Sequence, residues 1–432
     1  FYSPMLTFLK NQILYLNKYK THPEAVVIAC YFNPQNSPYR QRAFWVFYDT
    51  VRHLNHRIVE CVIGDATPQL PENAFITRVH TPNLLWHKET LLNKLVAGLP
   101  REYKYVFWLD ADVIFENKNW LVEGVQQLQT HALIQPFEYC VHLEKDQKKY
   151  ASPVPLPEVQ QQLQRCLEKK IDPGPIRVWR SFAANHQTGL SAHAHYDIHG
   201  HVGFAWGARR KVLETVPLYE RAFVGGADHI VAHAGAGHLG HACIGKSFTD
   251  NLAEVNEWSR RFYEAVQGRV GFVSGNLLHI WHGDVEKRQY LKRIQEFTPH
   301  TKQITEKDEN GLYVTSDDTY VRNYFSNREV ASSEPSVYSD ASDYSLNSTD
   351  TSSPQENQGR NVTSEAVVFG GGSFGGGGAG GDWGNNTAPV AHSSNDHAPF
   401  AAGEVMENAS VGNAISETNT SESTHFESSH FS

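Results

Sequence analysis

Two aspartates one residue apart interrupt an apolar run in the stretch "YVFWLDADVIFEN", residues 105–117. If the run forms one strand, side chains i and i+2 point to the same side, so Asp110 and Asp112 project together. Neighbouring carboxylates repel each other, and their burial is costly unless a cation lies beside them. A hard divalent ion such as Mn²⁺ or Mg²⁺ takes one or two carboxylates and completes its shell with substrate phosphates. We therefore expect a metal site with Asp112, ahead of Asp110, as direct ligand; the alternative is a pair that caps a turn or a helix.

The segments before the aspartates alternate between strand and helix patterns. Short apolar, β-branched runs predict strands, and apolar residues at helical spacing predict helices. The strands are expected at 25–32, 57–65 and 103–115, and the helices at 42–55 and 84–100. This order predicts an α/β fold with a mostly parallel sheet and helices on both faces. Ligands bind such sheets at the carboxyl ends of the strands, where the aspartates are expected to lie.

The pattern after the aspartates is less regular. Residues 185–245 are rich in His and Gly, which is typical of functional loops. The remaining predictions are helices at 119–129, 252–267 and 284–296, a strand within 131–143, and an inserted helix and loop at 145–175.

The acidic charge of the chain is concentrated near its C-terminal end. The 432 residues carry −9, but residues 331–432 carry −12, so residues 1–330 carry +3. So mild a balance gives no indication of a nucleic-acid partner. The Ser/Gly-rich residues 331–432 are expected to form a disordered tail. An N-terminal helical segment is expected at 1–22, and one domain at 23–330.

Five scattered cysteines show no C-x-x-C spacing, so we expect small buried hydrophobes rather than disulfides or a zinc knuckle. They are Cys30, Cys61, Cys140, Cys166 and Cys243. No run reaches the ~18 apolar residues of a membrane span, and no signal peptide is visible. N-x-S/T sequons occur only beyond residue 330, which favours a cytoplasmic location. The chain begins with Phe1 rather than Met. If an N-terminal anchor is missing from this chain, the expected protein is instead lumenal or membrane-associated.

The stretch "FWLDADVIF" resembles the Asp-x-Asp motif of GT-A-fold, nucleotide-sugar-dependent glycosyltransferases. Residues from roughly 25 to 295 are similar in their order of motifs to the galactosyltransferase and chondroitin-synthase-like enzymes. The resemblance implies a nucleotide-sugar donor, above all a UDP-sugar, an acceptor hydroxyl on a glycan or another molecule, and Mn²⁺ or Mg²⁺ as cofactor. It also implies a nucleotide-binding half at 23–117 and an acceptor-binding, metal-completing half at 118–300.

The resemblance carries over to residues at strand ends and on the first helices. It implies nucleotide contacts from Tyr31, Asn33, Arg42, Asp65 (to the uracil or ribose) and from Lys88, Asn93 or Lys94. Asp110 would bond the ribose or reach the metal through water. The segment "GHVGFAWGARRKVLE" resembles the one that lines the sugar pocket, where small residues allow close backbone approach. Trp206 would stack there on a sugar ring, unless it packs in the core.

Two further segments resemble catalytic and metal-completing parts of these enzymes. In "FVGGADHIVAH", Ala227 replaces the Glu of a Gly-Gly-Glu-Asp segment, and Asp228 remains as the base that activates the acceptor, with inversion. Its alternative role is to cap a helix. In "LLHIWHGDVEKRQY", His282 and then His279 are the implied metal ligands. Lys287 and Arg288 would stabilise the departing diphosphate, or lie on a solvated helix face.

A second hypothesis rests on the His-rich region 193–241, which suggests a zinc-dependent hydrolase. Its candidate ligands are His193, His195, His199, His201, Asp228, His229 and His233. His229 and His233 are four residues apart, as in the H-E-x-x-H motif, but Ile230 occupies the Glu position. A third hypothesis is a non-catalytic sugar-binding or scaffold protein with a degenerate site.

Overall fold

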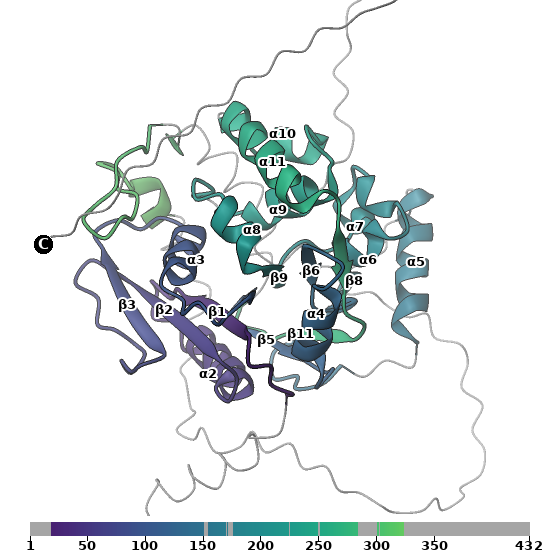
Figure 1. Cartoon of the computed structure of the whole chain (residues 1–432), viewed down its shortest axis with the longest axis horizontal. Helices are drawn as coiled ribbons and strands as arrows, with labels where there is room; N and C mark the ends of the chain where they lie inside the picture. Colours follow the sequence, from purple (N-terminus) through teal and green to yellow (C-terminus); the bar gives the residue numbers. More distant parts are fainter. Residues whose placement is uncertain are drawn as a thin grey trace, which may run out of the picture. The chain divides into compact units, whose positions relative to one another are not determined.

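A seven-stranded mixed sheet forms the centre of the computed structural model (Figure 1). The structure describes residues 19–150, 154–169, 171, 176–223, 225–248, 251–283, 300–301 and 303–323. The strands lie in the order β10 (Val270–Phe272), β6 (Leu133–Gln135), β9 (Ala205–Arg209), β4 (Tyr105–Leu109), β1 (Ala25–Tyr31), β2 (His56–Ile63) and β3 (Ile76–Thr81). Only β9 runs antiparallel to its neighbours, β6 and β4. The predicted α/β class with a mostly parallel central sheet is confirmed.

Helices cover both faces of this sheet. The side chains of β1 alternate between the two faces and so belong to two different cores. Val26 and Ile28 belong to the core shared with helices α3 (Lys88–Ala97), α8 (Arg210–Thr215), α9 (Ala227–Ala236) and α11 (Leu252–Val266). Val27 and Ala29 belong to the core shared with α2 (Pro38–Val51) and α4 (Trp120–Gln127). Burial on both sides explains why this strand is a continuous apolar run in the sequence.

A second sheet of four strands explains where the two aspartates lie. Its order is β5 (Val113–Phe115), β11 (Asn276–His279), β7 (Tyr139–His142) and β8 (Val178–Arg180). The strand predicted at 103–115 is therefore two strands, because the chain turns at 110–112 and passes from β4 in the central sheet to β5 in the second. The strand predicted within 131–143 divides in the same way into β6 and β7. Both aspartates lie at a junction between the two sheets.

Several predicted helices are present with different bounds. Helix α2 begins at Pro38, earlier than predicted, because the Ser37 side chain accepts a hydrogen bond from the Arg40 amide and proline suits the first turn. Residues 84–87 are not helical, and α3 begins at Lys88. The predicted loop region 185–245 contains β9 and several helices. The remaining helices are α5 (Leu156–Glu168), α6 (Phe182–His186), the 3₁₀ helix η1 (Leu190–Ala192), α7 (Tyr196–His199) and α10 (Ala242–Ser247).

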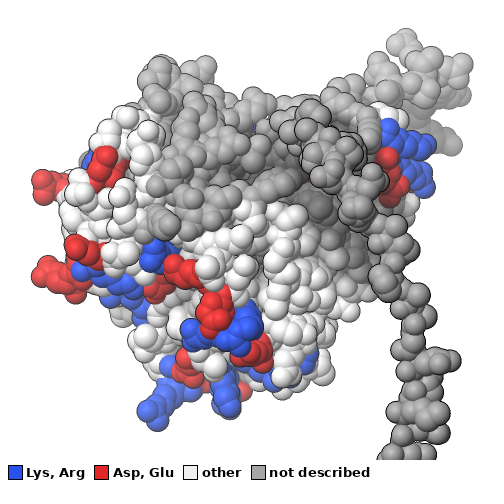
Figure 2. Space-filling view, turned by 90° about the horizontal axis from the view of Figure 1, so that it is seen from above, with Lys and Arg blue, Asp and Glu red and all other residues white. Residues whose placement is uncertain are grey.

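Some predictions fall outside the described residues: most of the N-terminal segment, the helix at 284–296 and the acidic tail at 331–432. Among the helices that the structure describes, none combines the length and the apolar character needed to cross a membrane. Figure 2 shows basic and acidic side chains interspersed over the described part of one face.

Candidate functional site

Asp112 meets two histidines because β5 and β11 pair in antiparallel register. Val113 lies opposite His279, and the amide of Ile280 donates to the carbonyl of Asp112 over 2.8 Å. His282 Nε2 lies 3.0 Å from Asp112 Oδ2, and His279 Nε2 lies 3.7 Å from the same oxygen. One potential ligand atom from each of the three side chains lies within 4.8 Å of the others. The structure thus brings together three of the four predicted metal ligands.

The electrostatics of this cluster fit a bound cation. Burial alone would raise the pKa of Asp112, but His279 and His282 outweigh that effect and hold the pKa well below its usual value. Asp112 Oδ1 is buried and has no hydrogen-bond partner among the described residues. A carboxylate with two imidazoles suits a divalent transition ion such as Mn²⁺ better than Mg²⁺, which takes oxygen ligands.

Contact of Asp110 with the ribose, or with the metal through water, stays a prediction, but the prediction that both carboxylates project together is wrong, because Asp110 does not join Asp112 at this cluster. The turn between β4 and β5 breaks the strand geometry on which that prediction rested. Asp110 Oδ1 instead lies 2.7 Å from Lys88 Nζ, at the first turn of α3. The same ammonium lies 3.2 Å from Asp228 Oδ2, at the start of α9. A cation does lie beside Asp110, but the protein itself provides it.

The three charges are largely removed from solvent, and the pKa values of Lys88 and Asp228 are both shifted. Burial alone would lower the pKa of Lys88, but Asp110 and Asp228 raise it well above its usual value. Burial raises the pKa of Asp228 to about 6, against the opposing effect of Lys88. Glu89, the next residue of α3, is buried, and burial raises its pKa to about 8. Burial therefore makes Asp228 a stronger proton acceptor than an exposed aspartate.

Phe204 joins the two groups of side chains. Its carbonyl accepts a hydrogen bond from the Asp110 amide over 2.7 Å, and its ring stacks on His279 at 4.9 Å and on His201 at 4.2 Å. Its φ of 77° is unusual for a bulky residue and is expected to cost of order 1–3 kcal/mol. Phe204 was not among the predicted site residues, because no short sequence pattern indicates a positive φ at phenylalanine.

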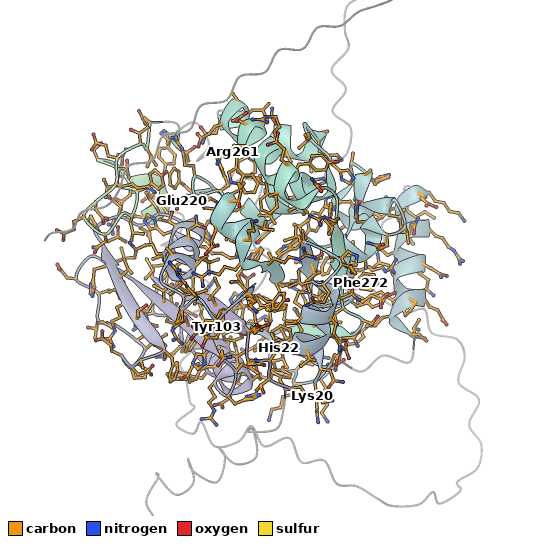
Figure 3. All side chains as sticks on the ribbon, viewed as in Figure 1. Lys20, His22, Tyr103, Glu220, Arg261 and Phe272 are labelled. Atoms are coloured by element: carbon orange, nitrogen blue, oxygen red, sulfur yellow. The ribbon has the colours of Figure 1, made fainter. Side chains whose placement is uncertain are left out.

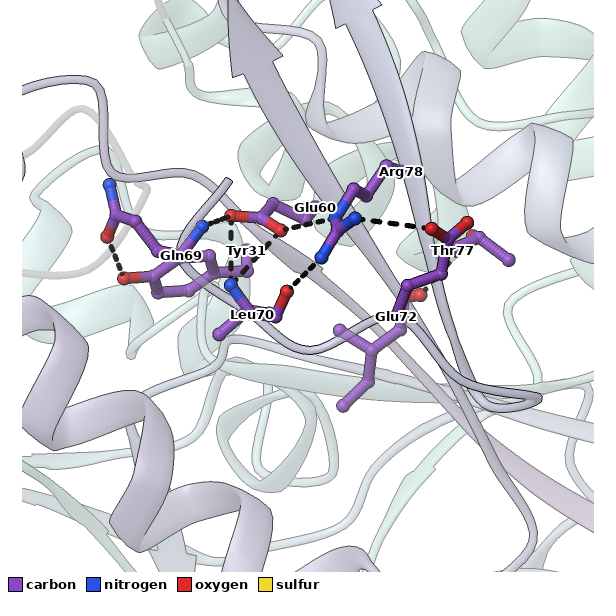
Figure 4. A network of polar contacts seen from close by, with 8 residues as sticks. Tyr31, Glu60, Gln69, Leu70, Glu72, Thr77 and Arg78 are labelled. Carbon is purple, nitrogen blue, oxygen red and sulfur yellow. Dashed lines mark hydrogen bonds and ion pairs between the residues drawn. The ribbon is translucent and has the colours of Figure 1, made fainter. Parts of the chain in front are cut away.

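Tyr31 and Asn33, predicted to contact the nucleotide, are buried in a polar network at the end of β1. Asn33 Nδ2 donates to Tyr31 Oη over 3.1 Å and to Gln69 Oε1 over 2.8 Å, and Tyr31 Oη donates to Gln69 Oε1. Glu60, from β2, accepts hydrogen bonds from the amides of Gln69 and Leu70 (Figure 4). These contacts hold the loop after β2 against the end of β1.

Arg42 and Asp65 are more accessible to solvent than Tyr31 and Asn33. Arg42, on α2, pairs with Asp146 over 3.5 Å, and Asp65 is exposed beyond the end of β2. Near the start of α2, the ring of Tyr39 contacts the ring of Trp281, with their centroids 4.9 Å apart. Trp281 lies between His279 and His282 in the sequence. Helix α2 therefore borders the segment that provides His279 and His282.

Two predicted site residues have structural positions instead. Asn93 uses its side chain to bond the backbone amide and carbonyl of Leu218 and the carboxylate of Glu220, each over 2.9 Å (Glu220 is labelled in Figure 3). Trp206 is fully buried, and its indole donates to the Val202 carbonyl over 2.7 Å. Stacking of Trp206 on a sugar is therefore wrong for this position. Lys287 and Arg288 lie outside the described residues.

The His-rich region separates into different environments. His193 is exposed, and His195 lies 3.7 Å from the carboxylate of Asp197. His201 is buried against Phe204, as described above. Three other histidines converge with a cysteine, and the cluster is His199, His229, His233 and Cys243. For Cys243 the sequence predicted only a buried position. Cysteine and histidine at mixed spacings are a weak sequence signal, because the fold rather than the spacing brings them together.

Comparisons with known proteins leave the family open. No family model matches the sequence, and no curated protein matches it. Glucosyl-3-phosphoglycerate synthase from Mycobacterium tuberculosis, solved with Mn²⁺, UDP and phosphoglyceric acid, is similar at 10% identity and a TM-score of 0.30, over 66% of this chain and 80% of that chain. 4-Diphosphocytidyl-2C-methyl-D-erythritol synthase from Anaerococcus prevotii is similar at 8% identity and a TM-score of 0.25, over 74% and 99%. Similarities of this size assign neither family nor activity, so function has to be inferred from the side chains.

Proposed function

We propose that this protein is a GT-A-type glycosyltransferase that moves a sugar from a nucleotide-sugar, a UDP-sugar above all, to an acceptor hydroxyl. The observation that carries the proposal is the pair of neighbouring centres after β4. Asp112, His279 and His282 form a potential metal site, and two residues earlier Asp110 begins the chain of contacts through Lys88 to Asp228. The pair lies at the carboxyl end of β4, on the edge where open α/β sheets bind ligands.

Asp112, His279 and His282 would hold a divalent ion, Mn²⁺ in preference to Mg²⁺. Such an ion acts as a Lewis acid that stabilises negative charge on a diphosphate leaving group. The buried and unpaired Asp112 Oδ1 supports this assignment, since a buried carboxylate oxygen is costly without a partner. Three protein ligands leave room in the coordination shell for oxygens of the donor.

Asp228 would be the general base. The acceptor oxygen attacks the anomeric carbon, the bond from that carbon to the diphosphate oxygen breaks, and the hydroxyl proton passes to Asp228. The products are the glycoside and a nucleoside diphosphate, and a single displacement of this kind inverts the anomeric configuration. Lys88 would hold the carboxylate in place, since its ammonium contacts Asp110 and Asp228 together. Asp228 also lies at the N-terminal end of α9, where the helix dipole favours its negative charge.

A panel of nucleotide-sugars, screened for release of nucleoside diphosphate with and without Mn²⁺, tests this proposal on the full chain. We expect Mn²⁺-dependent release from one class of donor. Asp112→Asn should abolish release and weaken Mn²⁺-dependent UDP binding. Asp228→Asn should abolish transfer and leave UDP binding nearly unchanged. Asp317→Asn is the matched control, because Asp317 is an exposed carboxylate that belongs to neither group of site residues.

Two outcomes would contradict the proposal. Wild-type protein that neither binds UDP with Mn²⁺ nor releases nucleotide from any donor is not a transferase of this type. Loss of UDP binding together with transfer in Asp228→Asn would mean that Asp228 has a structural role. A product with the anomeric configuration of the donor would refute inversion alone.

A further inference from the structure

Four buried side chains converge at a second place. This group shares no residue with the Asp112 cluster. His199 ends α7, His229 and His233 lie one turn apart on α9, and Cys243 lies on α10. One potential ligand atom from each lies within 4.8 Å of the others. The four residues are between 0% and 3% exposed. Elements separated along the chain therefore direct three imidazoles and one thiol at a common point.

The backbone and neighbouring side chains orient these imidazoles. His229 and His233 share a face of α9 because residues four apart lie one above the other on a helix. His199 Nδ1 lies 2.9 Å from the carbonyl of Gly200, to which only a protonated nitrogen can donate. His233 Nδ1 lies 3.3 Å from His238 Nδ1. The outer nitrogens of two rings thus have partners, and their Nε2 atoms face the centre.

The contacts inside the cluster leave polar atoms poorly satisfied. His199 Nε2 and His229 Nε2 lie 3.3 Å apart, and His199 Nε2 must be an acceptor because the opposite nitrogen donates to Gly200. His229 would then have to donate from Nε2, which leaves its Nδ1 as a bare acceptor. His229 Nδ1 is in fact buried and has no partner among the described residues.

We propose that His199, His229, His233 and Cys243 bind a structural zinc ion. Zinc–nitrogen bonds of about 2.0–2.1 Å and a zinc–sulfur bond of about 2.3 Å put two nitrogens about 3.3 Å apart, and a nitrogen and the sulfur about 3.6 Å apart, in a tetrahedral site. The observed 3.3 Å between the Nε2 atoms of His199 and His229 matches the first value, whereas the 3.1 Å between His233 Nε2 and Cys243 Sγ is shorter than the second, so zinc would have to move these two atoms apart. A separation of 3.3 Å is longer than a good hydrogen bond between nitrogens.

The ligand set indicates a structural ion rather than a catalytic one. Three histidines and a thiolate complete a tetrahedron from protein atoms alone, whereas catalytic zinc keeps one position open for water or substrate. The near-complete burial of all four residues agrees with this. The zinc would tie α7 and α10 to α9, the helix that carries Asp228. This inference does not depend on the proposed transferase activity.

His241 contacts the cluster from outside, at Cys243 and at His233. Its ring stacks on that of His233 at 4.1 Å. His241 Nδ1 accepts a hydrogen bond from the Cys243 amide over 3.4 Å and its Nε2 lies 3.2 Å from the Ala192 carbonyl, so Nδ1 is an acceptor, and the Cys243 Sγ atom 2.9 Å from it would donate to it as a thiol. The competing explanation is a hydrogen-bonded histidine core without metal, in which Cys243 is a protonated thiol.

Metal analysis of the full chain, purified without chelators or affinity-tag metals and dialysed extensively, separates the two explanations. We expect about one zinc ion per chain, retained against dialysis because folding and binding are coupled. Cys243→Ser and His229→Gln should each lose the zinc. Cys61→Ser is the matched control, a buried cysteine of β2 outside the cluster, and should retain it. Asp112→Asn should also retain it, which separates this site from the proposed Mn²⁺ site.

Cobalt replacement tests the ligands without relying on variants that could fail to fold. Wild-type chain stripped of zinc and loaded with Co²⁺ should show the visible bands of a tetrahedral ion and a near-ultraviolet thiolate charge-transfer band. A conservative Cys243→His variant should keep tetrahedral bands and lose the thiolate band. Zinc below about a tenth of an ion per chain, with no tetrahedral Co²⁺ spectrum and no change in melting temperature on chelation, would overturn the proposal. Zinc that is lost only in Asp112→Asn would overturn it as well.

Discussion

Replacing Lys88 with methionine removes a cation that two carboxylates share. The ammonium lies 2.7 Å from Asp110 Oδ1 and 3.2 Å from Asp228 Oδ2, and the Lys88 side chain is 17% exposed. Methionine keeps the length and the apolar stem of lysine, so packing should change little. The main effect is electrostatic, because Asp110 and Asp228 would then face each other without a counter-charge.

The expected loss of stability follows from this geometry. Unit charges about 4 Å apart interact by roughly 4 kcal/mol at the effective dielectric constant of a protein. Removing one partner of a buried pair typically costs 3–5 kcal/mol, because it leaves an uncompensated charge. Residual solvent access and proton uptake by Asp228 both reduce the penalty. We therefore expect Lys88→Met to lower the free energy of unfolding by about 3 kcal/mol near pH 7.

Guanidinium unfolding, followed by fluorescence and far-UV circular dichroism, measures this loss if both probes give one transition. Arg260→Met is the matched control, because Arg260 also pairs with two carboxylates, Glu257 and Glu264, but on an exposed helix face. Its effect should be far smaller. Combining Lys88→Met with Asp228→Asn should recover part of the loss. A Lys88→Met variant as stable as the Arg260→Met control would refute the assignment of a buried charge cluster.

Three further changes test other parts of the structure. Glu89 has a pKa raised from 4.5 to about 8 by burial, so the unfolded chain loses this proton first and stability should fall as pH rises through that interval. Glu89→Gln should remove this fall, of at most about 5 kcal/mol, in unfolding curves measured from pH 5 to 8. Gly207→Ala would place a Cβ 2.5 Å from the Phe107 ring and should lower the melting temperature, with a cost of about 1–3 kcal/mol. Glu60→Gln would turn an amide donor toward the Leu70 amide and should cost about 1–3 kcal/mol in urea unfolding, whereas an unchanged midpoint would contradict the network.

The central sheet could be predicted because its first strands have a local signal. Residues 25–31 are apolar on both sides, and the helices that follow have clear apolar spacing, so order and class follow from neighbouring residues alone. The break at 110–112 could not be predicted in the same way. Residues 105–115 look like one long apolar strand with two aspartates in it, and only pairing with β9 and β11, far along the chain, assigns the two halves to different sheets.

The candidate site shows the same division between local and distant information. Asp112, His279 and His282 could be predicted together because each lies in a motif with a recognisable residue type. Lys88 could be placed on the correct helix, but its contact with Asp110 and Asp228 depends on the packing of α3 against α9. Local residue types indicate which groups can do chemistry, whereas the tertiary structure determines which of them meet.

Helix α9 carries residues of both proposed sites in one short segment. Gly225 and Gly226 have φ values of 82° and 93°, so the chain enters the helix through a conformation that favours glycine. Asp228 and His229 follow as consecutive residues, about 100° apart around the helix axis. That rotation directs Asp228 toward Lys88 and His229 toward the His199 and Cys243 cluster. A metal that fixes His229 and His233 would therefore also fix the rotation of α9, and with it the position of the carboxylate proposed to accept the proton.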